Sequence, residues 1–176
     1  MRLLIVEDEM DIVDGICETI KDHQVKEIEI MLAGDAGNAL SLIFSQEPDK
    51  RPDAIVLDIM LPYGSAFKEL KAETDVGMNH TGIKILERLR NKEREDVTYF
   101  SHNPLFVAVI TGRADPAIYQ VIERNLDGWG RIYPKPFIED EMLNDLFFVT
   151  NVHFEIDSDL MPKGYVLPST RYGDQI

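Results

Sequence analysis

The stretch Ala54-Ile55-Val56-Leu57-Asp58 places a carboxylate directly after a short apolar run. The run has the length and β-branched content of a strand that is buried on both faces. An acidic residue at the end of such a strand is expected on the rim of the sheet, where open α/β folds hold their chemistry. Asp58 is therefore the first candidate functional residue.

Polar groups follow three further apolar runs in the same way. They are Glu7, Asp8 and Glu9 after the run 3–6, Thr111 and Gly112 after the run 105–110, and Lys135 and Pro136 after the run 131–133. The carboxyl ends of parallel strands share one edge of a sheet, so in a parallel sheet these groups would all meet Asp58.

This set resembles the receiver domain of two-component response regulators. That family has an acidic pair after the first strand, a phosphoacceptor Asp after the third, Ser or Thr after the fourth and Lys-Pro after the fifth. The matching residues here are Glu7 and Asp8, Asp58, Thr111, and Lys135 with Pro136. The resemblance covers roughly residues 1–150, and it is specific because all the groups occur in the correct order at strand ends.

Strand-like and helix-like segments alternate along the chain, which is typical of βαβ units and a parallel sheet. The predicted strands are 3–6, 28–32, 54–57, 105–110 and 131–133, and the predicted helices are 11–21, 35–45, 82–94, one starting at 116, and 139–149. The resemblance implies an α/β, flavodoxin-like, doubly wound five-stranded parallel sheet of order 2-1-3-4-5, with helices on both faces.

Helix caps and apolar stripes support these helices. Asp35 and Asp115 are predicted to cap the second and fourth helices, with Pro116 in the first turn of the fourth. The side chains expected to face inward are Ile12, Ile16 and Ile20 in the first helix and Ile83, Leu86 and Leu89 in the third.

The resemblance implies a chemistry for the site. Asp58 would accept a phosphoryl group from a partner phosphohistidine, and an anion attacking an anion needs charge neutralisation. Mg²⁺ would provide it, held by Asp8, Asp58 and the Met60 carbonyl, with Glu7 acting through water. Lys135 would supply a fixed positive charge, and the Thr111 hydroxyl would donate to the phosphoryl group.

Two features near Lys135 concern how a signal leaves the site. The family has an aromatic residue three positions before the lysine, but here that position is Ile132 and Tyr133 follows it. Period-two alternation predicts that Ile132 and Tyr133 face opposite sides of the sheet. The Lys135-Pro136 bond is expected to be cis, as is common in the family.

The domain prediction is a receiver over 1–150 and a C-terminal extension over 151–176, with no separate output domain. The extension is expected to pack on the receiver rather than serve as a partner-binding arm. An insertion, Tyr63 to Thr81, lengthens the loop after the third strand and could cover Asp58 as a lid. A second long link, 91–104, is expected on the side away from the chemistry.

Composition limits the partners and the compartment. A net charge of −14 argues against nucleic acid and anionic membranes as direct partners. No stretch approaches the roughly 20 apolar residues of a membrane span. A single cysteine, Cys17, and a strand starting at the N-terminus without a leader favour the cytoplasm. The histidines have no metal-ligand spacing.

Three functions compete. The first is a stand-alone receiver, a signalling module and not an enzyme, that takes its phosphoryl group from a histidine kinase or histidine phosphotransfer protein and acts on an unknown downstream protein. The second is a pseudo-receiver, a protein-interaction module that works without phosphate. The third, a haloacid-dehalogenase-type phosphatase, ranks last because Met60 stands where that family has its second Asp. A monomer or weak dimer is expected.

Overall fold

The computed structural model describes residues 1–23, 28–66, 80–90, 105–112 and 115–150. Its strands are β1 (Arg2–Val6), β2 (Glu29–Ala33), β3 (Ala54–Asp58), β4 (Phe106–Thr111) and β5 (Gly130–Pro134). They form a 5-stranded sheet of order β2-β1-β3-β4-β5 in which every pair is parallel. The predicted fold class and strand order are confirmed.

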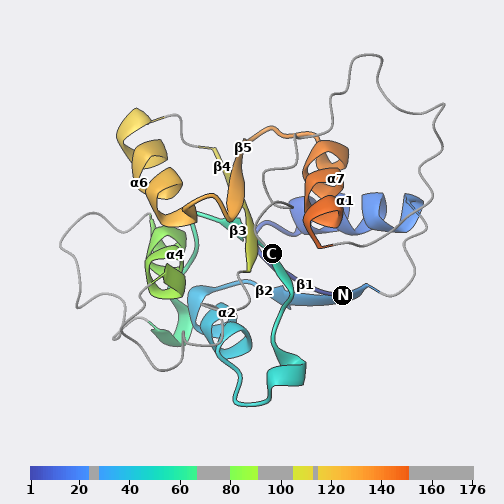
Figure 1. Cartoon of the computed structure of the whole chain (residues 1–176), viewed down its shortest axis with the longest axis horizontal. Helices are drawn as coiled ribbons and strands as arrows, with labels where there is room; N and C mark the ends of the chain where they lie inside the picture. Colours follow the sequence, from blue (N-terminus) through green and yellow to red (C-terminus); the bar gives the residue numbers. More distant parts are fainter. Residues whose placement is uncertain (24–27, 67–79, 91–104, 113–114, 151–176) are drawn as a thin grey trace, which may run out of the picture.

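Helices cover both faces of this sheet (Figure 1). They are α1 (Met10–Asp22), α2 (Ala36–Ile43), α4 (Thr81–Arg90), α6 (Pro116–Leu126) and α7 (Glu139–Val149), with short 3₁₀ turns η1 (Pro48–Lys50) and η2 (Gly64–Ala66). The helices α1 and α7 lie on one face, and α2, α4 and α6 on the other. None of the helices in the described ranges is long and apolar enough to cross a membrane.

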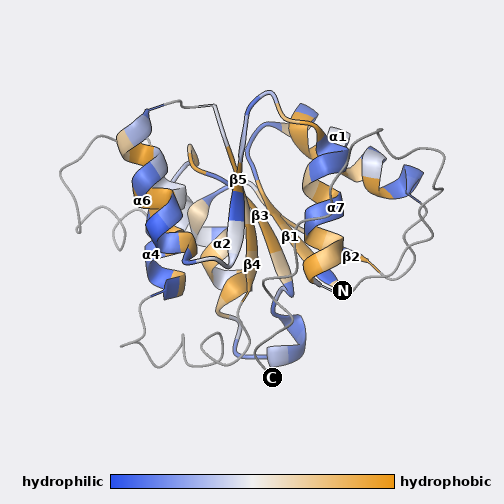
Figure 2. Ribbon diagram, turned by 45° about the horizontal axis from the view of Figure 1, so that its top comes forward, coloured by the Kyte–Doolittle hydropathy of each residue, from blue (hydrophilic) through white to orange (hydrophobic). Residues whose placement is uncertain are grey.

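Each face of the sheet contributes to its own hydrophobic core, and β3 contributes to both. Ile55 and Leu57 pack toward α2, α4 and α6, whereas Ala54 and Val56 pack toward α1 and α7. All residues of β3 are buried, which explains its uninterrupted apolar run. Figure 2 shows hydrophobic central strands between helices whose hydrophilic residues lie mainly on the outside.

The predicted caps are confirmed. The Asp35 carboxylate accepts a hydrogen bond from the Asn38 amide at 2.9 Å, and the Asp115 carboxylate accepts one from the Ala117 amide at 2.9 Å. Pro116 occupies the first turn of α6. Both caps are local features, so they depend little on the tertiary structure.

The inward face of α4 is broader than predicted. Leu86 and Leu89 are buried as expected, but Ile83 is only partly buried, whereas Ile85, outside the predicted stripe, is fully buried. The reason is that α4 packs against α2 and α6 as well as the sheet, so it buries more than one stripe. In α1, Val13 is buried together with Ile16 and Ile20, and Ile12 is partly buried.

Several sequence predictions fall outside the described residues. They concern most of the insertion after Ala66, the link 91–104, the last residues of the predicted helix 82–94, and the extension 151–176. These remain predictions.

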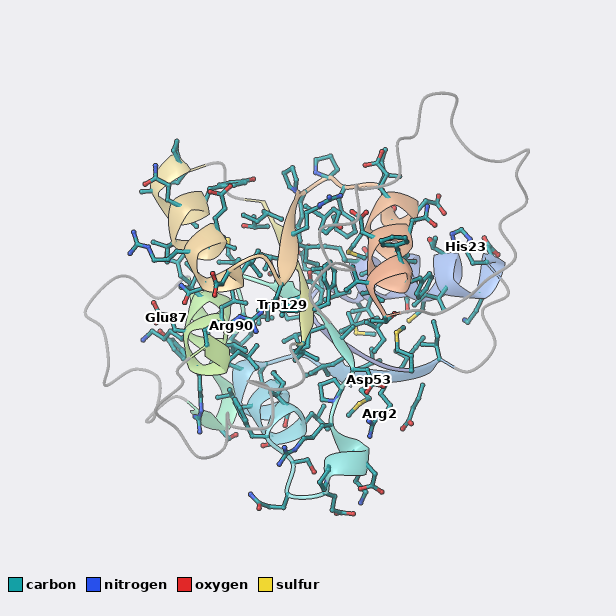
Figure 3. The ribbon with its side chains drawn as sticks, in the orientation of Figure 1. Arg2, His23, Asp53, Glu87, Arg90 and Trp129 are labelled. Carbon is teal, nitrogen blue, oxygen red and sulfur yellow. The ribbon has the colours of Figure 1, made fainter. Side chains whose placement is uncertain are left out.

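Polar contacts tie the elements together away from the carboxyl edge (Figure 3). The Arg2 amide donates to the Asp53 carboxylate at 2.7 Å, and the Arg2 guanidinium lies 3.1 Å from the same carboxylate. At the C-terminal end of α4, the Arg90 guanidinium donates to the carbonyl oxygens of Asn125 at 2.9 Å and Trp129 at 3.5 Å. Arg90 therefore links α4 to the end of α6 and the start of β5.

Two leucines test how much the core contributes to stability. Leu4 in β1 is fully buried, whereas Leu32 in the edge strand β2 is 52% exposed. We expect Leu4→Ala to lower the free energy of unfolding by about 2–5 kcal/mol, because it removes buried surface and leaves a cavity. The matched variant Leu32→Ala should cost less than about 1 kcal/mol. Urea denaturation of both variants measures this, and equal losses would contradict the core assignment.

Candidate functional site

The predicted polar residues meet at the carboxyl edge of the sheet. Asp58 is the last residue of β3 and Thr111 is the last residue of β4, and in the paired strands Asp58 lies opposite Ile110. Glu7 directly follows β1, and Lys135 directly follows β5. The strands β1, β3, β4 and β5 are consecutive neighbours in the sheet, so their carboxyl ends lie side by side.

The ammonium group of Lys135 lies at the centre of this group. Its Nζ donates to Glu7 Oε2 at 2.8 Å, and it lies 3.6 Å from Asp58 Oδ1. It also lies 3.5 Å from Glu9 Oε1. Glu9 was recognised in the sequence as part of an acidic run, but its approach to Lys135 was not predicted, because the run could not show which carboxylates would turn toward β5.

Glu7 has donors at both oxygens. Its Oε1 accepts hydrogen bonds from the amides of Asp8 and Glu9, each at 3.1 Å, while Oε2 faces Lys135. The residue is 2% exposed. A carboxylate this buried needs such partners to offset its desolvation.

Asp58 and Asp8 complete a cluster of carboxylates. Asp58 is 3% exposed, and its Oδ1 accepts a hydrogen bond from the Ile59 amide at 2.8 Å. Asp8 is exposed, and ligand atoms of Glu7, Asp8 and Asp58 lie within 4.8 Å of one another. Oxygen donors at this spacing suit a hard divalent cation such as Mg²⁺.

Glu7, Asp58 and Lys135 have shifted pKa values. Burial is the largest effect on Asp58 and Glu7, and it raises the pKa of both despite the opposing effect of Lys135 and nearby amides. Burial acts to lower the pKa of Lys135, but the hydrogen bond to Glu7 and the charges of Asp58, Glu7 and Glu9 outweigh it and raise the pKa. Lys135 therefore stays charged, and the excess of negative charge favours a bound cation.

Thr111 and Gly112 lie at the end of β4, next to β5. Thr111 is fully buried, and its carbonyl oxygen accepts a hydrogen bond from the Lys135 amide at 2.8 Å. Apart from its chain neighbours, no described residue has an atom within 4 Å of where a Cβ on Gly112 would be, so there is open space beside Gly112. The Lys135-Pro136 peptide bond is cis, as the resemblance implies.

Gly82 provides a contact that was not predicted from the sequence. A Cβ at this position would lie 2.2 Å from the carbonyl oxygen of Asp58 and 2.7 Å from the Cα of Ile59. The Gly82 amide donates to the Ile59 carbonyl oxygen at 3.0 Å. The sequence placed Gly82 at the start of a helix, and the structure shows that this start rests directly on the backbone of the candidate acceptor.

The chain that leaves the site is held by α2. The amides of Ala36 and Gly37 donate to the carbonyl oxygens of Pro62 at 2.9 Å and Tyr63 at 3.2 Å. Met60, the predicted carbonyl ligand, has a side chain at the surface and is 40% exposed. The first turn of α2 therefore fixes the path of the chain just after Asp58 and Met60.

Ile132 and Tyr133 face opposite sides of the sheet, as predicted. Ile132 packs with the core under α4 and α6, whereas Tyr133 is buried in the core under α1 and α7. The Tyr133 hydroxyl donates to Asp145 Oδ2 in α7 at 2.7 Å. The aromatic side chain of β5 is therefore directed inward and bonded to a helix.

Comparisons with known proteins agree with this fold. No protein-family model matches the sequence, and the search of curated proteins finds no match. Among solved structures, one similar protein is the signal receiver domain of a DNA-binding response regulator protein (merR) from Colwellia psychrerythraea 34H. It has a TM-score of 0.60 and 18% identity, over 86% of this chain and 98% of that chain.

Two further solved structures are similar. The CheY-like receiver domain protein from Methanospirillum hungatei JF-1 has a TM-score of 0.55 and 20% identity, over 85% of this chain and 93% of that chain. The Mn²⁺-bound form of response regulator Rcp1 has a TM-score of 0.52 and 20% identity, over 85% of this chain and 88% of that chain. At these identities the likeness establishes the fold, and the chain has the fold of response regulator receiver domains.

Gly82→Ala tests the close approach of α4 to Asp58. The added methyl group would meet backbone atoms that cannot move independently, so we expect a loss of about 1–3 kcal/mol in the free energy of unfolding. A matched control is Gly15→Ala in α1, where a Cβ would meet Glu139 Oε1 at an ordinary 3.5 Å. That variant should be neutral or gain up to about 1 kcal/mol, because alanine favours the helix. Equal effects in urea denaturation would refute the contact.

Asp58→Asn tests the raised pKa of the acceptor. The pKa of Asp58 is higher in the folded protein than in the unfolded chain, so protonated Asp58 stabilises the folded state. This stabilisation is complete below the ordinary pKa of the group and is lost as pH rises through the raised pKa. At neutral pH the ionised Asp58 therefore opposes folding. We expect Asp58→Asn to raise the urea midpoint at neutral pH, in buffer containing a chelator, and to raise it less in acid.

The control for this pH series is Asp14→Asn, which changes an exposed carboxylate of α1. Its urea midpoint should stay close to that of the unmodified protein throughout. A midpoint for Asp58→Asn that is unchanged or lowered at neutral pH would show that burial does not control this carboxylate.

Proposed function

We propose that this protein is a phosphorelay signalling receiver in which Asp58 accepts a phosphoryl group and another protein responds to the change in conformation. The observation that carries this proposal is the position of Lys135, 2.8 Å from Glu7 and 3.6 Å from Asp58, beside a cluster of carboxylates. A nucleophilic carboxylate, a fixed cation and a candidate metal site within one small region are what phosphoryl transfer to Asp requires.

A divalent cation, Mg²⁺, completes the proposed site. Asp8 and Asp58 would bind it directly, together with the Met60 carbonyl, and Glu7 would act through water. The close approach of the Glu7, Asp8 and Asp58 oxygens supports this set, as does the Mn²⁺-bound form of the similar response regulator Rcp1. When bound, the cation neutralises negative charge on the carboxylates and on the incoming phosphoryl oxygens.

The proposed reaction is a displacement at phosphorus. A carboxylate oxygen of Asp58 attacks the phosphoryl group of a phosphohistidine, the O–P bond forms and the P–N bond breaks. The leaving nitrogen keeps the bonding electron pair and takes up a proton. Lys135 stabilises the negative charge that develops on the phosphoryl oxygens, since it stays protonated in this acidic cluster.

Thr111 and Gly112 would receive the transferred group. Thr111 ends β4 next to Asp58, and the open space at Gly112 leaves room for phosphoryl oxygens. We assign to the Thr111 hydroxyl the role of hydrogen-bond donor to the phosphoryl group. Its backbone bond to Lys135 would pass any movement of Thr111 to β5.

The proposed partners follow from this chemistry. The donor is a histidine kinase or a histidine phosphotransfer protein, and the output is contact with a further protein in the cytoplasm. We assign residues 1–150 to the receiver, with an insertion at 63–81, and residues 151–176 to an extension rather than an output domain. The proposed role is that of a signalling module rather than an enzyme acting on an external substrate.

A pseudo-receiver that works without phosphate is the second candidate. The observation in its favour is that Ile132 occupies the position in β5 where the resemblance expects an aromatic switch, while the neighbouring Tyr133 is buried and bonded to Asp145. The two candidates differ in a single measurable property, which is acceptance of a phosphoryl group by Asp58.

Intact-mass spectrometry with Mg²⁺ and acetyl phosphate tests the proposal. The unmodified protein should gain the mass of one phosphoryl group, Asp58→Asn should gain none, and Asp8→Asn should gain far less because the cation is lost. The control Asp14→Asn, at an exposed position of α1, should behave like the unmodified protein. If the unmodified protein gains no mass and does not bind beryllofluoride, the pseudo-receiver is the better description.

A further inference from the structure

Three side chains join β5 to α7 on the face opposite Ile132. Asp145 of α7 is buried, and its Oδ2 accepts hydrogen bonds from the Tyr133 hydroxyl at 2.7 Å and from Arg131 Nη1. Arg131 and Tyr133 are two residues apart in β5, so both point to the same side of the sheet. We call Arg131, Tyr133 and Asp145 the β5–α7 clasp.

The two oxygens of the Asp145 carboxylate differ in their hydrogen bonding. Both donors bind Oδ2, whereas Oδ1 is buried and has no hydrogen-bond partner among the described residues. A buried carboxylate oxygen without a donor is costly, and an arginine can bind both oxygens of a carboxylate at once. The Arg131 side chain is 53% exposed and therefore has room to turn. A second arrangement, in which Arg131 binds both oxygens of Asp145, is therefore open to these residues once the Tyr133 hydroxyl leaves Oδ2.

The clasp is connected to the candidate site through the backbone of β5. Tyr133 lies opposite Ile110 in the strand register, one residue before Thr111. Two residues after Tyr133, the Lys135 amide donates to the Thr111 carbonyl oxygen at 2.8 Å. A displacement of Thr111 or Lys135 would therefore move the end of β5, and with it the Tyr133 side chain relative to α7.

We propose that the β5–α7 clasp opposes phosphorylation, because its Tyr133–Asp145 hydrogen bond belongs to the unphosphorylated state and is released when Asp58 is loaded. This inference rests on the proposed function. Before loading, Lys135 is bonded to Glu7 at 2.8 Å and is farther from Asp58, at 3.6 Å. Loading draws Lys135 and Thr111 toward the phosphoryl group, so Tyr133 leaves Oδ2 and Arg131 turns to bind both oxygens of Asp145.

The Tyr133–Asp145 bond stabilises the unloaded state only. It must therefore weaken the binding of a phosphoryl group or its analogue at Asp58, because breaking the bond and loading Asp58 are linked equilibria. Tyr133→Phe removes that bond and nothing from the site itself. We therefore expect the variant to bind beryllofluoride with Mg²⁺ about threefold to tenfold more tightly than the unmodified protein, the effect of one hydrogen bond. Isothermal titration calorimetry on the full chain measures the affinity.

Two other variants sharpen the test. Arg131→Lys keeps one charged donor for Asp145 Oδ2 but cannot bind both carboxylate oxygens at once, so it should weaken beryllofluoride binding. Tyr119→Phe is the matched control, since it removes a tyrosine hydroxyl from α6, on the other face of the sheet, and should change nothing. Urea denaturation confirms that each variant folds, and if Tyr133→Phe does not, Arg131→Lys carries the test.

The response of α7 hydrogen exchange to beryllofluoride provides a readout that a purely structural contact would not change. Beryllofluoride should lower the protection of α7 amides in the unmodified protein, whereas Tyr133→Phe should show the lower protection before beryllofluoride is added. Unchanged or weaker beryllofluoride binding by Tyr133→Phe, or unchanged or tighter binding by Arg131→Lys, would overturn the inference while leaving Asp58 as the acceptor. If the unmodified protein neither gains a phosphoryl mass nor binds beryllofluoride, the proposed function fails and the clasp inference fails with it.

Discussion

The ammonium group of Lys135 holds three carboxylates together where the strands of the parallel sheet end. It contacts Glu7 at 2.8 Å, Glu9 at 3.5 Å and Asp58 at 3.6 Å. Without this cation, Glu7 and Asp58 would be two buried anions close to each other, which a folded protein tolerates poorly. The negative charge that Lys135 does not neutralise would attract a divalent metal ion. Lys135 therefore stabilises the metal-free site while leaving enough negative charge to bind the metal.

The rest of the fold keeps that group of charges in place. The start of α4 is pressed onto the backbone of Asp58 at Gly82, and the first turn of α2 binds the chain at Pro62 and Tyr63. The strand β5 contributes side chains to the cores on both faces of the sheet, since Ile132 packs under α4 and α6 and Tyr133 under α1 and α7. A movement at the end of β5 would therefore displace side chains in both cores. Through the buried hydrogen bond from Tyr133 to Asp145, it would act directly on α7.

Much of this arrangement was predictable from local patterns. Short apolar runs alternate with helical segments, which favours a parallel sheet, and the carboxyl ends of parallel strands must share one edge. That rule alone brings the acidic pair after β1, Asp58, Thr111 and Lys135 to one edge. The caps at Asp35 and Asp115 were equally predictable, because each acts on an amide within three residues. These features depend on neighbours in the chain or on strand order.

Other features were decided only by the tertiary structure. The approach of Glu9 to Lys135, the contact of Gly82 with the Asp58 carbonyl and the bond from Tyr133 to Asp145 depend on how helices sit on the sheet. The wider buried face of α4, which includes Ile85, has the same origin. The sequence by itself determined the alternation of strands and helices and the edge that carries the candidate site, and its resemblance to receiver domains implied the strand order. Side-chain directions and helix packing decided which of those residues touch, because no periodic pattern encodes the distance between two elements that meet only in the folded chain.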